Sequence, residues 1–223
     1  MITSDRLFVA RPKTSNGAAI LVFQEAFGVN GHIREVAQRF ADLGYLAVAP
    51  ELFHRTAQRG FEAGYDEYDK LRPHMDALTP EGLTEDARAA FDFAAAQPGI
   101  DRTRIACIGF CMGGRASFLA NAALELRAAT SFYGGGIAPA LLDRASQQHG
   151  PLLMFWGGKD AHIPPEQYRA VADALTAAGK DHTQVVPSDA DHGFFCDQRA
   201  SYDGKAATQA WALCRAFLES NGV

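Results

Sequence analysis

The sequence of 223 residues has only four cysteines, and no two of them form a Cys-x-x-Cys pair. The absence of such a pair argues against a structural zinc site. Four scattered thiols suit a reducing compartment better than a disulfide framework. We therefore expect a cytoplasmic protein with reduced thiols and with no metal and no cofactor.

Long hydrophobic runs are also missing. No window of about 18 apolar residues could span a membrane, and the first six residues, MITSDR, lack the apolar core of a signal peptide. The formal net charge is −5, so the chain lacks the basic excess of a protein that binds nucleic acid or an anionic membrane. These absences predict neither a membrane nor a nucleic-acid partner.

Short apolar runs alternate with longer segments of helical periodicity. The runs are apolar on both faces, as in a parallel sheet that helices cover on both sides. The predicted strands are 18–23, 45–49, 104–109, 128–133, 152–156 and 183–186, and the predicted helices are 32–43, 81–97, 112–123, 165–178 and 201–220. This alternation predicts one α/β domain over residues 1–223, with a mostly parallel central sheet.

One segment, residues 51–75, has little periodicity but several aromatic and charged residues. A long excursion after the carboxyl end of a strand often covers a site. The alternative is a solvated surface loop that contains a short helix.

The most specific pattern is GFCMGG at residues 109–114. It follows a predicted strand and begins a predicted helix, which is the context of the nucleophile elbow in the α/β-hydrolase fold. Here Cys111 takes the place of the usual serine, and the helix N-terminus behind it favours the thiolate. Cys111 is therefore the predicted nucleophile. The alternative is a buried structural cysteine, the role expected of Cys107.

A cysteine nucleophile needs a base, and His192 is the best candidate. It follows the last predicted strand, and loops in that position converge on the carboxyl edge of the sheet. His162, in the preceding loop, is the alternative.

The base in turn needs an acid to orient it, and Asp160 follows the strand 152–156. The order Cys111, Asp160, His192 is the nucleophile–acid–base order of α/β-hydrolases. Asp189 and Asp191 compete for this role, although Asp191 is a poor candidate because neighbouring side chains rarely point together.

Glu25 follows another predicted strand and would lie at the mouth of the same site. Its loop is the one that supplies the second oxyanion donor, so the predicted donors are the backbone N–H groups of Ala26 and Met112. The alternative for Glu25 is a helix cap or a salt bridge to Arg34 or Lys159.

The segments QEAFGVN at 24–30, GFCMGG at 109–114 and HGFF at 192–195, together with Asp160, resemble the dienelactone hydrolase (carboxymethylenebutenolidase) family over nearly the whole chain. The resemblance implies cleavage of a small-molecule ester or lactone through a cysteine acyl-enzyme. It also implies that Glu25 keeps Cys111 a poorly reactive thiol until substrate moves the carboxylate, which then takes the thiol proton. His192 and Asp160 would serve later steps, including deacylation.

The chain departs from this family in its arginines. Members that cleave dienelactone hold the substrate carboxylate with two arginines, one of them four residues after the catalytic histidine, where this chain has Cys196. At the other position no arginine aligns. Without that clamp an anionic substrate loses charge-assisted contacts, so a neutral ester or lactone is favoured. The candidate substrate contacts are Phe27, Arg72, Phe195 and Arg199.

Two other functions fit the same residues. The first is hydrolysis of another activated ester such as a phosphotriester, since an oxyanion hole also stabilises charge on a phosphoryl oxygen. The second is a non-enzymatic thiol sensor, which requires a resolving cysteine beside Cys111. Cys107 should be buried below the elbow, which argues against the sensor. The sequence is compatible with a monomer or a homodimer.

Overall fold

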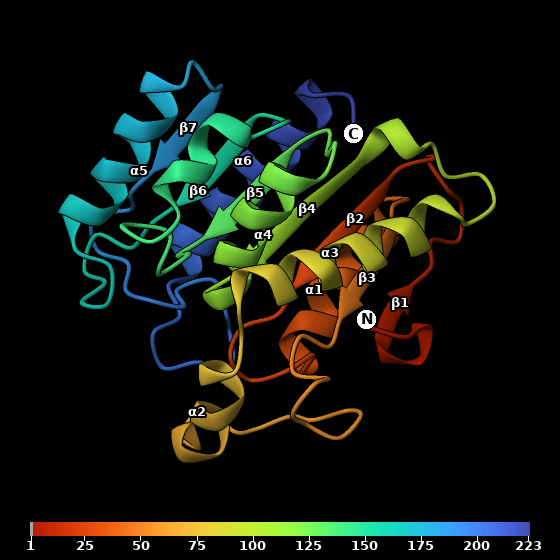
Figure 1. The fold of residues 1–223 in the computed structure, drawn as a ribbon, viewed down its shortest axis with the longest axis horizontal. Coiled ribbons are helices and arrows are strands. Elements are labelled where there is room, and N and C mark those ends of the chain that lie inside the picture. The colour runs from red at the N-terminus through yellow and green to blue at the C-terminus, as the bar shows by residue number, and fades with distance from the viewer. Residues whose placement is uncertain (1) are drawn as a thin grey trace.

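A seven-stranded sheet forms the centre of the computed structural model, which describes residues 2–223 (Figure 1). Its strand order is β1-β3-β2-β4-β5-β6-β7. The first strand runs antiparallel to its neighbour, and all the other pairs are parallel. The strands are β1 Leu7–Ala10, β2 Ala19–Phe23, β3 Leu46–Pro50, β4 Ile105–Phe110, β5 Ala129–Phe132, β6 Leu152–Phe155 and β7 His182–Val185.

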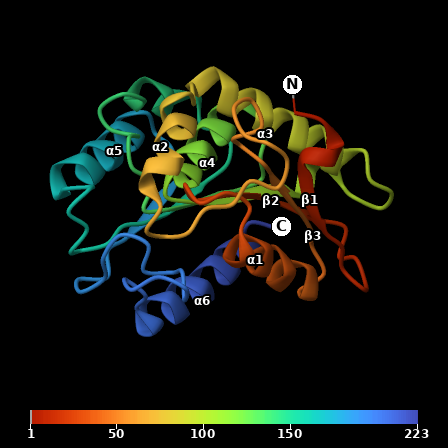
Figure 2. The ribbon, with the colours of Figure 1, turned by 90° about the horizontal axis from the view of Figure 1, so that it is seen from below.

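Helices cover both faces of this sheet, as Figure 2 shows. The helices α1 and α6 lie on one face, and α3, α4 and α5 lie on the other. The helices are α1 Gly31–Asp42, α2 Tyr68–Asp76, α3 Pro80–Ala95, α4 Met112–Ala123, α5 Pro165–Ala177 and α6 Gly204–Ser220, with short 3₁₀ turns at Ser4–Arg6, Arg102–Arg104 and Leu142–Gln147. The predicted mostly parallel α/β sheet is therefore confirmed.

The central strands β2, β3 and β4 are buried along their whole length because helices pack on both of their faces. The helix α1 shows how the sequence directs this packing. Asn30 caps it by accepting a hydrogen bond from the backbone N–H of Ile33 at 3.2 Å. Its apolar stripe, which includes Ile33, Val36 and Phe40, is fully buried against the sheet.

All six predicted strands and all five predicted helices are present, with ends that differ by a few residues. The strand β1 was not predicted. It is short, lies at the edge of the sheet and is only partly buried, so its apolar pattern is weak. Within residues 2–223, no helix combines the length and the apolar character needed to cross a membrane.

The chain reverses its direction of travel across the sheet between β2 and β4. From β2 it passes through α1 to β3 on one side, whereas β4 pairs with the other side of β2. The helices that follow these two strands, α1 and α4, lie on opposite faces (Figure 2). Such a reversal leaves a crevice at the carboxyl ends of the two strands, where ligands bind in open α/β sheets. Glu25 and Cys111 follow these strand ends.

Candidate active site

Cys111 occupies a sharp turn between β4 and α4. Its backbone has φ 56° and ψ −120°, in a region that residues with a side chain rarely adopt. Its N–H donates to the carbonyl of Phe132 at 3.0 Å, which ties the turn to the neighbouring strand. Strained backbone of this kind persists only where the surrounding structure holds it, and it is common at active sites. The geometry is that of a nucleophile elbow.

Glycine is required on either side of the Cys111 turn, because neighbouring backbone segments approach too closely to leave room for a side chain. A Cβ on Gly109 would lie 1.9 Å from the carbonyl oxygen of Gly113. A Cβ on Gly113 would lie 2.3 Å from the carbonyl oxygen of Phe23 on β2. A side chain at either position would push α4 away from the sheet and move the thiol.

The structure joins His192 to Asp160 across 32 residues of sequence. Nδ1 of His192 lies 2.7 Å from Oδ2 of Asp160, and the other carboxylate oxygen accepts from the backbone N–H of His162 at 2.8 Å. Both side chains are largely buried. Since Nδ1 is engaged by Asp160, Nε2 of His192 is the nitrogen left for the reaction.

His192 and Asp160 each shift the pKa of the other toward its charged form. Burial lowers the pKa of His192, but the hydrogen bond to Asp160 and the adjacent Cys111 outweigh burial and raise the pKa to about 10. Burial raises the pKa of Asp160, but its hydrogen bonds to His192 and to the N–H of His162 bring that pKa below its usual value. Both residues are therefore shifted toward their charged forms.

The competing aspartates point elsewhere. Asp191 is exposed and accepts from the backbone N–H of His192 at 2.6 Å, so it does not reach the ring. Asp189 pairs with Lys159 at 2.9 Å on the surface. His162 lies beside the site, with its ring centroid 5.3 Å from that of His192. By geometry, Asp160 is the residue that can orient His192.

Glu25 lies in the loop after β2 and is 1% exposed. One of its carboxylate oxygens, Oε1, accepts from Nη1 of Arg199 at 3.2 Å, and the other, Oε2, has no partner in residues 2–223. Burial raises the pKa of Glu25 more than Arg199 and His192 lower it. The alternative partners suggested by the sequence are engaged elsewhere, since Arg34 pairs with Glu62 and Lys159 with Asp189.

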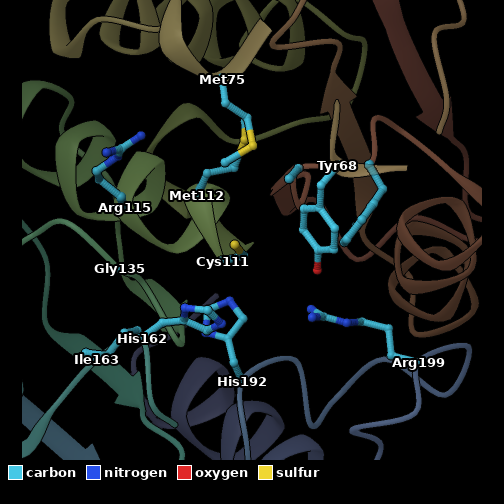
Figure 3. A pocket seen from close by; sticks show the side chains of 12 residues that line it. Tyr68, Met75, Cys111, Met112, Arg115, Gly135, His162, Ile163, His192 and Arg199 are labelled. Atoms are coloured by element: carbon cyan, nitrogen blue, oxygen red, sulfur yellow. The ribbon is translucent and has the colours of Figure 1, made fainter. Parts of the chain in front are cut away.

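The side chains around Cys111 line a cavity of about 270 Å³ that opens to solvent. Figure 3 shows Cys111 and His192 on its wall, with Arg199 and Arg115 on opposite sides of the thiol. Of the residues predicted from sequence, Ala26, Phe27, Cys111, Met112, His192 and Arg199 line this cavity. Met112 is the first residue of α4, so its backbone N–H has no acceptor within the helix.

Two of the candidate substrate contacts do not reach the cavity. The side chain of Arg72 is 82% exposed and faces Asp76 across 3.6 Å. Phe195 is buried in the core, where its ring stacks on Phe110 and packs against Phe132. The fold places Arg72 on the exposed face of α2 and packs Phe195 against the ends of β4 and β5, so we assign neither to the site.

Several residues that line the cavity were not predicted from the sequence. Tyr68 and Met75 reach it from α2, so the excursion at residues 51–75 supplies two side chains to the cavity wall. In Figure 3 the Tyr68 hydroxyl points toward Arg199. Arg115 reaches the cavity from α4. It lies four residues after Cys111, one helical turn on, and that spacing was the signal that could have identified it.

Comparison with known proteins agrees with this geometry. The sequence profile of the dienelactone hydrolase family matches residues 6–221. A proposed carboxymethylenebutenolidase of Synechocystis sp. is 37% identical over 210 residues, which cover 90% of this chain and 85% of that protein. One from Escherichia coli is 34% identical over 226 residues, 96% of this chain and 81% of its own. The crystal structure of a proposed dienelactone hydrolase from Klebsiella pneumoniae matches with a TM-score of 0.86 at 33% identity, covering 96% of this chain and 92% of that one. By sequence along nearly its whole length and by fold, this chain belongs to the dienelactone hydrolase family.

Proposed function

We propose that this protein hydrolyses a carboxylic ester or lactone of a small molecule through an acyl-enzyme formed on Cys111. The observation that carries the proposal is the position of Cys111, on a strained turn that opens into a cavity of about 270 Å³ shared with His192. A cavity of this size suits a small substrate. Family membership supports the ester or lactone bond as the target.

The reaction proceeds in two halves. The Cys111 thiolate attacks the carbonyl carbon, and the backbone N–H groups of Ala26 and Met112 stabilise the negative charge on the carbonyl oxygen. The tetrahedral intermediate collapses, the carbon–oxygen bond of the ester breaks, and the alkoxide or enolate takes a proton from His192, whose raised pKa keeps the resting ring charged. A water molecule then attacks the thioester while His192, oriented by Asp160, takes its proton. Collapse releases the acid and restores Cys111.

The proposal is tested by trapping the acyl-enzyme. Rapid mixing with excess p-nitrophenyl acetate should give a burst of close to one p-nitrophenol per chain. Digestion of the acid-quenched protein should place one acetyl group on the peptide that contains Cys111. A burst that persists with the acetyl group on another residue, or turnover with no covalent species, would contradict the proposed mechanism.

Glu25 is the proposed acceptor of the thiol proton. Because burial raises its pKa, Glu25 is a stronger base than an exposed carboxylate. It does not line the cavity itself, but its partner Arg199 does. A substrate that draws Arg199 away would free Glu25 to turn toward Cys111, which ties activation of the thiol to substrate binding.

Glu25→Gln should therefore change two rates in opposite directions. Iodoacetamide should alkylate Cys111 faster, because removal of a nearby negative charge favours the thiolate. Acylation by substrate should become slower, by about 10²-fold, because the general base is lost. Both rates should be followed from about pH 5 to 9, a window that spans carboxylate, imidazole and thiol titration.

Glu62→Gln is the matched control, since Glu62 is a half-exposed glutamate paired with Arg34. This change should leave both rates near those of the wild type. If Glu25→Gln left both rates unchanged as well, Glu25 would have no part in the mechanism.

The cavity also holds a cation without a counterion. Arg115 forms no ion pair within residues 2–223, and its Nε is buried without a hydrogen-bond partner. Its guanidinium packs against Gly136, where an added Cβ would lie 2.9 Å from Nη1. Burial lowers the pKa of Arg115, with only Cys111 opposing. The sequence favoured a neutral substrate because a family arginine is missing, but a free guanidinium in the cavity supports an ester or lactone that carries a carboxylate.

Arg115→Gln should consequently change the preference for substrate charge. For a p-nitrophenyl ester of a dicarboxylic acid, kcat/KM should fall by about 10- to 100-fold, the loss of a hydrogen bond to a charged group. For the neutral ester of the same chain length, kcat/KM should change by less than about threefold. Arg72→Gln, which removes an exposed arginine of α2, should alter neither value. An equal loss with both esters would mean that Arg115 supports the elbow and does not select the substrate.

A further inference from the structure

A second group of reactive side chains lies outside the catalytic cavity. Glu25 from the loop after β2, His32 from the first turn of α1 and Cys196 from the loop before α6 converge in the interior. One ligand atom of each lies within 4.8 Å of the others. Glu25 and His32 are each 1% exposed and Cys196 is fully buried.

Hydrogen bonds within the protein do not satisfy this cluster. Neither ring nitrogen of His32 has a partner in residues 2–223, and Oε2 of Glu25 has none in good hydrogen-bond geometry, although the buried Tyr133 hydroxyl lies close to that carboxylate. The nearest charged group to His32 is Asp197, whose Oδ1 lies 3.9 Å from Nδ1, too far for a hydrogen bond. Buried polar atoms are nearly always paired, so the unpaired His32 ring beside Glu25 indicates a missing partner.

We propose that Glu25, His32 and Cys196 bind a divalent cation of the zinc class. The proposal concerns metal binding, which can be measured without reference to catalytic activity. A consequence of binding rests on the proposed function: a cation that holds Glu25 prevents it from taking the proton of Cys111. Zinc would then inhibit the enzyme reversibly.

The donor set selects this class of cation. A thiolate and an imidazole suit zinc and cobalt, whereas magnesium and calcium prefer oxygen ligands alone. Carboxylate and thiolate supply two negative charges to a divalent ion, and Arg199 already shares the carboxylate of Glu25. Both ring nitrogens of His32 are free of hydrogen-bond partners within residues 2–223, so either is open to a metal ion.

The cost of binding lies at Cys196. Burial and the neighbouring Glu25 raise the pKa of its thiol to about 11, and its sulfur lies 3.3 Å from the Tyr65 hydroxyl. On binding, the S–H bond breaks, the sulfur–metal bond forms and the proton leaves to solvent, with no change of oxidation state. Tetrahedral zinc bonds of about 2.0 to 2.3 Å require the three ligand atoms to draw together by about 1 Å.

Asp197 is a partly exposed carboxylate beside His32. Its side chain is 40% exposed while the adjacent His32 is buried, so a carboxylate at the surface stands next to the first ligand. Arg199 opposes the cation electrostatically, but it contacts the other oxygen of Glu25.

Cobalt(II) provides the test, because a cobalt–thiolate bond gives a charge-transfer absorption in the near ultraviolet. The measurement is made on Cys111→Ala protein, so that the catalytic cysteine cannot supply the thiolate. Addition of cobalt should produce this absorption, and zinc should displace it. Absence of the band in Cys111→Ala protein, or its presence only when Cys111 is intact, would overturn the proposal.

Two further variants in the same background identify the ligands. Cys196→Ser should abolish the charge-transfer band, and His32→Gln should weaken cobalt binding by at least about 100-fold. Cys214→Ser is the matched control, since Cys214 is another buried thiol, whose sulfur lies near Thr130, and it should retain the band. Zinc should also raise the melting temperature of Cys111→Ala protein but not of its Cys196→Ser derivative. A band or a shift that survives Cys196→Ser would refute the site.

With Cys111 intact, zinc should lower esterase activity, and chelation should restore it. When each variant is compared with its own metal-free rate, Cys196→Ser should lose this inhibition. Binding without inhibition would keep the metal site and refute the role of Glu25 in the proposed function. Inhibition that persists in Cys196→Ser would place the inhibitory zinc at Cys111 and His192 and overturn the regulatory part of the inference.

Discussion

Cys111→Ala is expected to lower kcat/KM for p-nitrophenyl esters by at least about 10⁴-fold, because it removes the sulfur that forms the covalent intermediate in the proposed mechanism. The fold should survive, since the change deletes one sulfur from a half-buried position and keeps a Cβ on the strained turn. Cys111→Ser should be nearly as poor, because an alkoxide forms far less readily than a thiolate in the same surroundings. Stopped-flow kinetics and thermal melting of the purified variants measure both effects.

Cys107→Ala is the control for this experiment. Cys107 precedes the nucleophile by four residues, but it is 1% exposed and its sulfur points toward the carbonyl of Ser117 at 3.7 Å. Its removal should leave the esterase rate within about threefold of the wild type. The burial of Cys107 also removes the resolving cysteine that a thiol sensor would need. Full esterase activity in Cys111→Ala would refute the central proposal.

His192→Ala should cost about 10³- to 10⁴-fold in kcat, and the covalent intermediate should accumulate if deacylation is the step that depends on the base. Asp160→Asn should cost about 10²- to 10³-fold, because an asparagine can no longer stabilise the charged imidazole. Asp191→Asn is the matched control, since this exposed aspartate contacts only the backbone beside His192. Single-turnover kinetics separates acylation from deacylation in each variant.

The same variants have a spectroscopic signature. The pKa of His192 is raised to about 10 by Asp160 and Cys111 acting against burial. Asp160→Asn removes one of these two partners, so the pKa of His192 should fall and the ring should lose its proton at a lower pH. NMR titration of the histidine ring should show this change in Asp160→Asn and not in Asp191→Asn. If Asp160→Asn left kcat and the pKa of His192 unchanged while Asp191→Asn lowered both, Asp191 and not Asp160 would be the acid that orients His192.

Local features of the sequence predicted the sheet, the helices and the elbow. Strands such as β2 are apolar over their full length. Helix α1 has apolar residues with a 3.6-residue period and an asparagine cap. Each element can therefore be predicted from a short stretch of sequence. The glycines around Cys111 could be recognised because they form a motif of consecutive residues, although Gly113 contacts Phe23 on β2, far away in the sequence. Features that depend on neighbours in sequence were therefore predictable.

Edge and excursion elements were less predictable. The strand β1 is half-buried and pairs with β3 from the far side, so its sequence carries little of the apolar signal of a central strand. The helix α2 is mostly exposed, with Leu71 as its one buried residue, and its pattern did not reveal which side chains would turn toward the thiol. Elements that bury little surface have a weak pattern of hydrophobic residues, so they are hard to predict from the sequence.

Long-range contacts depended on the folded chain. Glu25 meets Arg199 across 174 residues, and it meets His32 and Cys196 at a point that no spacing in the sequence indicates. Motif spacing identified Cys111, Asp160 and His192 as candidates, but the pairing of His192 with Asp160 over Asp191 required coordinates. The physical reason is that hydrophobic periodicity and turn chemistry act over only a few residues. The reversal between β2 and β4 instead brings loops that are distant in sequence to one crevice. There, burial and neighbouring charges set the reactivity of each side chain.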